Sequence, residues 1–181
     1  MNSVEVTFIR HPIGEEIIVM NETPSNQNRS LYNGSVIMLI GAVSFIGYAV
    51  VFLIRSFSNK GFELGVTTLN GVTREQLDAL NPGIVLYIGH LHIALSGFIA
   101  ATGIAAAALA WYGVRRGLVW AWIAAVISPV VALAVALPSH YMGNFKFDWV
   151  SHLGPIYLGT LIFVVGALIA LKGLLLKYHA K

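Results

Sequence analysis

The chain has 181 residues, of which 57% are hydrophobic and only 10% are charged, whereas a soluble domain carries about a quarter charged residues. The formal charge of +3 is spread over connections and termini, which argues against a nucleic-acid-binding surface. No cysteine is present to form disulfides, iron–sulfur clusters or thiolate zinc sites. The composition therefore indicates an integral membrane protein, with the lipid bilayer as its first partner.

Residues 1–35 form a polar N-terminal segment without the long apolar run of a cleavable signal peptide, so we expect the first membrane span to direct insertion. Charge-free stretches follow at residues 36–54, 84–112, 118–137 and 153–171. Each is close to or above the roughly 20 residues that cross about 30 Å of hydrocarbon as a helix. Glycine and alanine recur in all of them and allow close helix packing in lipid. We predict an all-α fold, an integral membrane four-helix bundle with short interfacial segments, over residues 36–181.

The connections between these helices differ in length and in local signals. In the first, Thr73-Arg-Glu-Gln76 has the pattern of a capping box and predicts a short surface helix that ends at Asn81. The second connection, residues 113–117, is predicted to be a tight turn. The third, residues 138–151, begins at a proline and carries several aromatic residues, which is typical of a segment at the membrane interface.

The lysines and arginines indicate the orientation in the membrane. With four spans, both termini lie on the same side as the Arg115–Arg116 turn, and seven of the 11 basic residues fall on that side. The positive-inside rule then favours cytoplasmic termini, in the cell (plasma) membrane. Triplets of the N-glycosylation type at Asn21, Asn28 and Asn33 point to the opposite orientation, although such triplets often arise by chance in a segment rich in Asn and Ser.

Histidines supply the constellation with the clearest potential for chemistry. His92, His140 and His152 belong to different predicted helices or their ends, and each lies about 30–34 Å of helix from the Arg115–Arg116 side. They therefore reach one depth, near the extracytoplasmic interface in the favoured orientation. His90 lies at almost the same depth, but two residues along a helix turn the side chain by about 200°, so His90 and His92 are not expected to bind one ion together.

Imidazole is a common ligand for copper, zinc and haem iron, and bundles build metal sites from side chains on separate helices. Asp148 precedes His152 by four residues, so it shares a helix face with His152 if the last helix starts early, and it could bind the ion or orient a histidine. Three tyrosines lie near the same level and could donate hydrogen bonds: Tyr87, Tyr141 and Tyr157. The alternative is that the histidines are packing residues at the membrane interface.

Short motifs around these histidines resemble known families. Gly89-His-Leu-His-Ile-Ala-Leu-Ser-Gly97 resembles the Gly-His-x-His-Leu helix opening of small membrane proteins related to haem–copper oxidase subunits, which implies His90 or His92 as a haem or copper ligand. Asp148-x-x-x-His152 is similar to part of the copper motif in the third subunit of membrane copper monooxygenases. That family has a further histidine where Val165 stands here, so such a copper site would need another histidine of this chain as a substitute.

These observations lead to alternative hypotheses for the function. In the first, the chain is a subunit of a membrane redox complex with a His-ligated metal or haem centre near the extracytoplasmic surface, with copper or haem b as cofactor and zinc as a further candidate. In the second, it is a non-catalytic accessory subunit of a larger membrane complex, including a copper monooxygenase-type assembly, and its histidines are structural. A carrier or sensor for a lipid or a metal ion is the third. Other membrane subunits are expected partners in the first two, because small residues exceed what four helices need.

Overall fold

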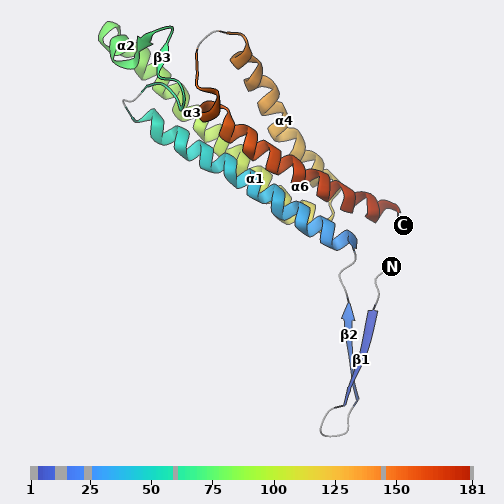
Figure 1. Cartoon of the computed structure of the whole chain (residues 1–181). Coiled ribbons are helices and arrows are strands. Elements are labelled where there is room, and N and C mark those ends of the chain that lie inside the picture. Colours follow the sequence, from blue (N-terminus) through green and yellow to red (C-terminus); the bar gives the residue numbers. More distant parts are fainter. Residues whose placement is uncertain (1–3, 11–15, 23–25, 59–60, 144–145, 180–181) are drawn as a thin grey trace.

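A computed structural model of the chain describes residues 4–10, 16–22, 26–58, 61–143 and 146–179. The long helices are α1 (Asn26–Ser56), α3 (Pro82–Ala108), α4 (Val119–Tyr141) and α6 (Gly154–His179). They run alongside one another in an elongated bundle, with the start of α1 and the end of α6 at the same end (Figure 1). Each is long and apolar enough to cross a membrane, which confirms the prediction of an all-α membrane helix bundle.

The other elements are short and lie at the ends of the long helices. An antiparallel hairpin of β1 (Val4–Arg10) and β2 (Glu16–Glu22) precedes α1, within the segment that the sequence identified only as polar. A smaller hairpin of β3 (Thr68–Leu69) and β4 (Val72–Thr73) and helix α2 (Arg74–Leu80) connect α1 to α3. A π-helical turn η1 (Leu109–Gly113) and a 3-10 turn η2 (Val114–Arg116) continue α3, and the one-turn helix α5 (Trp149–His152) precedes α6.

Small residues bring α1 and α6 together along most of their length. A Cβ atom added at Gly41 would lie 2.7 Å from the backbone nitrogen of Phe163, which is well inside van der Waals contact. Gly34 meets the backbone of Ala170 even more closely, and Gly166 meets that of Met38 in the same way. Packing replaces the hydrophobic effect between helices in lipid, so these close approaches hold α6 against α1. Helix α5, which directly precedes α6, is positioned with it.

Helix α4 extends beyond its predicted end. The third connection was expected to begin at Pro138, but α4 continues through that proline to Tyr141. A proline close to the end of a helix removes one backbone hydrogen bond and is compatible with helical φ, so the last turn survives. This extra turn carries His140 toward the rest of the bundle.

The capping box predicted at residues 73–76 is confirmed. The Gln76 amide donates to Thr73 Oγ1 at 3.2 Å, and the Thr73 amide donates to Gln76 Oε1 at 2.9 Å. Helix α2 ends at Leu80, and the Asn81 side chain accepts from the Gly83 amide at 3.0 Å to begin α3 with Pro82 in its first turn. These caps fix where α3 starts, and therefore the depth of His92 on it.

Candidate functional site

The loop after α1 folds back over the end of the bundle and carries Glu63 with it. Phe62 and Val66 are buried and anchor the loop, and the Phe62 amide donates to the Val66 carbonyl at 3.0 Å. Gly61 and Gly65 adopt positive φ values of 74° and 77°, a backbone conformation that residues other than glycine rarely adopt. This tight turn directs the Glu63 side chain inward, where only 27% of it is exposed.

The same loop is joined to the segment before α6. The Asp148 amide donates to the Gly65 carbonyl at 2.8 Å, and His152 Nδ1 lies 2.7 Å from the Leu64 carbonyl oxygen. A Cβ atom at Gly65 would lie 2.9 Å from the Asp148 carbonyl oxygen and 2.9 Å from Ser151 Oγ, so the two segments touch there. This contact, which we call the Gly65–Asp148 clasp, places Glu63 beside His152.

Three of the predicted histidines come together around Glu63. His92 Nε2 lies 3.0 Å from Glu63 Oε1, and His152 Nε2 lies 3.8 Å from Glu63 Oε2. His140 Nε2 lies 3.0 Å from His152 Nε2. His92, His140 and His152 come from α3, α4 and α5, so the expectation that separate helices deliver them to one depth agrees with their contacts. We call these histidines and Glu63 the His–Glu cluster.

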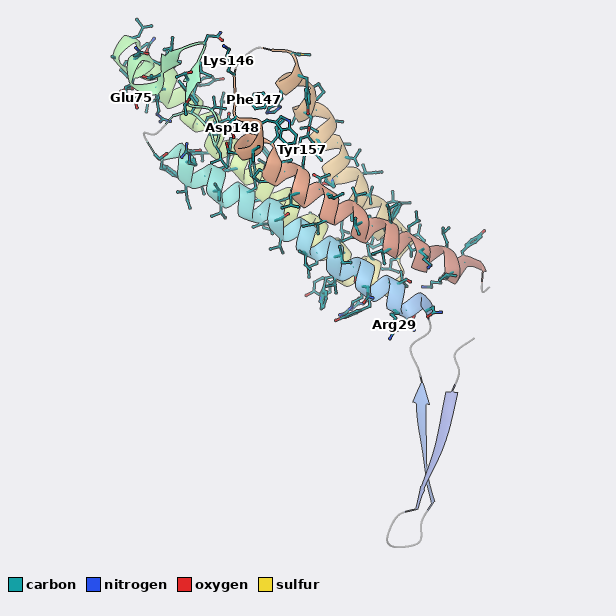
Figure 2. All side chains as sticks on the ribbon, viewed as in Figure 1. Arg29, Glu75, Lys146, Phe147, Asp148 and Tyr157 are labelled. Carbon is teal, nitrogen blue, oxygen red and sulfur yellow. The ribbon has the colours of Figure 1, made fainter. Side chains whose placement is uncertain are left out.

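Aromatic rings enclose the His–Glu cluster. The Phe52 ring meets the His92 ring edge-on, with centroids 5.1 Å apart. Phe147 contacts both other histidines, at 5.7 Å from the His140 ring and 5.1 Å from the His152 ring. His92 and His152 are buried, so their ring nitrogens contact other protein groups rather than water. Figure 2 shows Phe147, Asp148 and Tyr157 at this end of the bundle, with Arg29 at the opposite end.

The partners of the outer ring nitrogens determine where the protons of His140 and His152 lie. His140 Nδ1 lies 3.0 Å from the Ala136 carbonyl oxygen, and His152 Nδ1 lies 2.7 Å from the Leu64 carbonyl oxygen. A carbonyl oxygen only accepts hydrogen bonds, so both Nδ1 atoms must carry a hydrogen. In neutral rings each Nε2 atom then carries a lone pair and no hydrogen, and the two Nε2 atoms face each other at 3.0 Å. Two facing lone pairs repel unless a cation, either a proton or a metal ion, lies between them.

Glu63 supplies a negative charge beside this pair. Burial of the Glu63 carboxyl opposes its ionisation, but the hydrogen bond from His92 and favourable electrostatic interactions with the neighbouring His92, His152 and His140 side chains hold its pKa below the usual glutamate value. Because His92 faces a carboxylate oxygen through Nε2, that nitrogen carries the hydrogen. His92 therefore orients Glu63, while His140 and His152 present lone pairs.

Asp148 has a different position from the one that its spacing to His152 suggested. It is the N-cap of α5: its Oδ1 accepts from the Ser151 amide at 2.8 Å and from the Ser151 hydroxyl, and these hydrogen bonds lower its pKa. Its backbone carbonyl accepts from the His152 amide at 2.9 Å. The exposed Asp148 side chain thus acts on the start of α5, and Glu63 is the carboxylate that reaches the histidines.

The remaining residues predicted for the site, one histidine and three tyrosines, lie outside the His–Glu cluster. His90 is exposed, two residues from buried His92, as helical geometry requires. The Tyr141 and Tyr157 hydroxyls are hydrogen-bonded to each other, and the Trp149 ring stacks on Tyr157 at 5.6 Å. Tyr87 is 62% exposed. The tyrosine pair is adjacent to the cluster through the chain, since Tyr141 follows His140.

The spacing of the cluster limits what it can hold as it stands. Within the part of the chain that the structure describes, no group of three or more His, Cys, Asp or Glu side chains is spaced to hold a metal ion. The described arrangement supplies two nitrogens close together and a carboxylate slightly farther away. Glu63 was missed from the sequence because no periodic pattern covers its loop. The signal was Gly61-Phe-Glu-Leu-Gly65, an acid between apolar residues and flanked by glycines, which is typical of a turn folded onto a core.

Comparisons with known proteins add no functional information. The sequence matches no protein-family model, and no curated protein or solved structure is significantly similar to it. The resemblances to haem–copper oxidase and copper monooxygenase subunits therefore rest on the short motifs alone. The function has to be argued from the His–Glu cluster.

Proposed function

We propose that this membrane protein binds one transition-metal ion, copper or zinc, between His140 and His152, with Glu63 as the third donor. One observation carries the proposal: two Nε2 atoms face each other at 3.0 Å while each Nδ1 is held by a backbone carbonyl. Metal-binding histidines commonly donate their second ring nitrogen to a carbonyl or carboxylate, which fixes the tautomer with its lone pair toward the ion.

The distance between the two nitrogens supports a single small ion. Zn–N bonds of about 2.0–2.1 Å place two nitrogens about 3.3 Å apart at a tetrahedral angle and about 2.9 Å apart at a right angle. The observed 3.0 Å lies between these values. Axial ligands of a haem stand on opposite faces of the iron with the porphyrin between them, and 3.0 Å leaves no room for that ring. The proposal therefore favours copper or zinc over haem b for this pair.

Glu63 is the natural third donor because it is ionised and already near. Its Oε2 lies 3.8 Å from His152 Nε2, about half an ångström more than two ligands of one tetrahedral ion require. His92 holds the other carboxylate oxygen at 3.0 Å and leaves Oε2 available to move toward the ion. The positive charge of a bound ion would draw Oε2 inward and complete a set of two imidazoles and one carboxylate.

The identity of the ion decides the wider role. Copper in this site would be redox-active and would suit the sequence-based hypothesis of a subunit in a membrane redox complex. Zinc would bind without redox chemistry. Imidazole suits both ions, and the order of intrinsic affinities favours copper when both are offered.

The same observation supports a second candidate. A separation of 3.0 Å is also the length of an ordinary N–H···N hydrogen bond, so one shared proton between His140 and His152 would satisfy both lone pairs. The carboxylate of Glu63 would balance the resulting positive charge. In that case the cluster is structural, and the chain is an accessory subunit of a larger membrane complex.

Metal analysis of the purified full chain separates the two. After loading with copper or zinc and desalting, we expect about one ion per chain in the wild type and none in His140→Ala or His152→Ala. Glu63→Gln should weaken binding, and His90→Ala, which changes an exposed histidine two residues from the cluster, should leave it unchanged. An optical spectrum of the copper-loaded protein reports imidazole ligation independently. Equal metal content in the wild type and His140→Ala, or no retained metal in any form, would refute the metal site and favour the shared proton.

A further inference from the structure

The described carboxylates are confined to one end of the bundle, and the opposite end is basic. Among the side chains that the structure describes, the carboxylates all lie at the end with α2 and α5: Glu63, Glu75, Asp78 and Asp148. The opposite end, where α1 begins and α6 finishes, carries five described cations: Arg29, Arg115, Arg116, Lys172 and Lys177. Lys177 Nζ donates to the Arg116 and Gly117 carbonyl oxygens at 3.5 and 3.4 Å, so the end of α6 is attached to the turn between α3 and α4.

A pocket lies within this basic end. It has a volume of about 470 Å³ and is lined by Asn28, Arg29, Tyr32, Asn33 and Arg115. The first four come from the opening turns of α1, and Arg115 comes from η2 after α3. Two arginines, two asparagines and a tyrosine thus line one space, and no carboxylate is among the lining residues that the structure describes. We call this space the arginine pocket.

Arg115 is held in place by an aromatic ring. Its guanidinium carbon lies 4.2 Å from the centroid of the Trp111 ring, a cation–π contact. This contact restrains the guanidinium, whose N–H groups can still donate to an anion. Arginine binds phosphate through two parallel N–H···O bonds, and a restrained guanidinium loses less conformational entropy when it forms them.

We propose that the arginine pocket binds the phosphate group of an anionic phospholipid headgroup. Arg29 and Arg115 pair with the phosphate oxygens from two sides. Asn28, Asn33 and Tyr32 provide polar groups for the glycerol and ester oxygens around that phosphate. This site is separate from the metal site of the proposed function, and it is located at the other end of the bundle.

The position of the pocket favours a lipid over a free phosphate ion. Its lining residues lie in the first turns of the Asn28–Ser56 span and in the last turn of the Pro82–Arg116 span, so the pocket lies at the level where a membrane changes from hydrocarbon to headgroups. Tyr112 and Trp120 are more than half exposed beside the same turn, and such aromatic residues gather at this interface. The excess of basic residues also makes this the end that the positive-inside rule assigns to the cytoplasm, where anionic lipids are concentrated.

Lipid binding by the detergent-solubilised full chain tests the proposal. Short-chain phosphatidylglycerol, short-chain phosphatidylcholine and inorganic phosphate are titrated separately, and bound lipid is counted by native mass spectrometry. We expect saturable binding of one phosphatidylglycerol and about tenfold weaker binding in each of Arg29→Gln and Arg115→Gln, the typical loss for a charge-assisted hydrogen bond. Lys172→Gln removes an exposed charge from the same end outside the pocket and is the matched control.

Each outcome bears on the proposal. If Lys172→Gln weakens binding as much as Arg115→Gln, the attraction is a general charge effect and the arginine pocket is not the site. If inorganic phosphate binds as tightly as phosphatidylglycerol, the ligand is a free phosphate and the lipid assignment is wrong. Arg115→Lys keeps the charge but loses the paired N–H groups, so it should fold as the wild type does and still bind phosphatidylglycerol less tightly. Wild-type affinity in Arg115→Lys and Arg115→Gln together would overturn the proposal.

Discussion

Replacing Gly65 with alanine tests whether the Gly65–Asp148 clasp positions the His–Glu cluster. Gly65 has a φ of 77°, a conformation that costs an L residue roughly 1–2 kcal/mol. The new methyl group would also lie 2.9 Å from the Asp148 carbonyl oxygen and 3.0 Å from His152 Cβ, so backbone atoms would have to move by several tenths of an ångström. Overpacking of this kind costs about 1–3 kcal/mol.

Gly71→Ala provides the matched control. Gly71 lies in the turn between β3 and β4 with a φ of 88°, and nothing lies within 4 Å of the Cβ position. Gly71→Ala therefore has only the conformational cost of a positive φ, at a position away from the His–Glu cluster. The difference between the two variants isolates the contact term of about 1–3 kcal/mol, which corresponds to roughly a five- to 150-fold loss of metal affinity if the clasp must close for metal to bind.

The assay has a readout that does not depend on metal. Hydrogen exchange by mass spectrometry should show faster exchange in peptides spanning residues 61–66 and 146–153 in Gly65→Ala, because the Asp148 amide loses its bond to the Gly65 carbonyl. The long helices should exchange as in the wild type. Metal titration of the same samples gives the affinity. The reasoning fails if Gly65→Ala and Gly71→Ala exchange and bind metal alike.

The remaining predictions concern packing, pH and topology. Gly166→Ala should lower the thermal unfolding temperature in detergent because the methyl group meets the Met38 backbone, whereas Gly47→Ala, with nothing within 4 Å, should not. The pKa of Glu63 is lowered in the folded protein, so its ionised carboxylate stabilises the fold at pH values above the usual glutamate pKa, and this stabilisation is lost as the pH falls through the lowered value. Glu63→Gln should therefore make the free energy of unfolding less dependent on pH in the acid range. An unchanged pH dependence would show that Glu63 is not the group responsible. Cysteines replacing exposed Lys172 and Lys146 should be labelled from the cytoplasm and from outside, respectively, since the chain has no other cysteine, and the reverse pattern would invert the proposed orientation.

The depth of the histidines could be predicted from the sequence because the rise of an α-helix per residue is nearly constant. Charge-free stretches locate the helices, and counting from the Arg115–Arg116 turn then places His92, His140 and His152 at one level. The count needed α4 to pass Pro138, which it does. Rotation about each helix axis depends on packing against neighbours, and the sequence carries no direct measure of it.

The carboxylate could not be assigned in the same way. Asp148 has helical spacing to His152, but α5 is a separate turn that begins just after Asp148, so its side chain caps that turn. Glu63 comes from an irregular loop whose path depends on positive φ values at Gly61 and Gly65 and on bonds to a segment far along the chain. Such contacts between distant segments leave no periodic signal, so the sequence identified the histidines of the cluster and missed its acid.

The close packing of α1 against α6 also has a consequence for biosynthesis. Helix α1 leaves the ribosome well before α6, with α3 and α4 synthesised between them. During synthesis, the glycine face of α1 that includes Gly34 and Gly41 has no α6 to cover it until α3 and α4 have been inserted. We therefore expect a nascent chain that stops before Gly154 to be retained by membrane chaperones or degraded, because its first helix presents an unfilled backbone groove to the lipid.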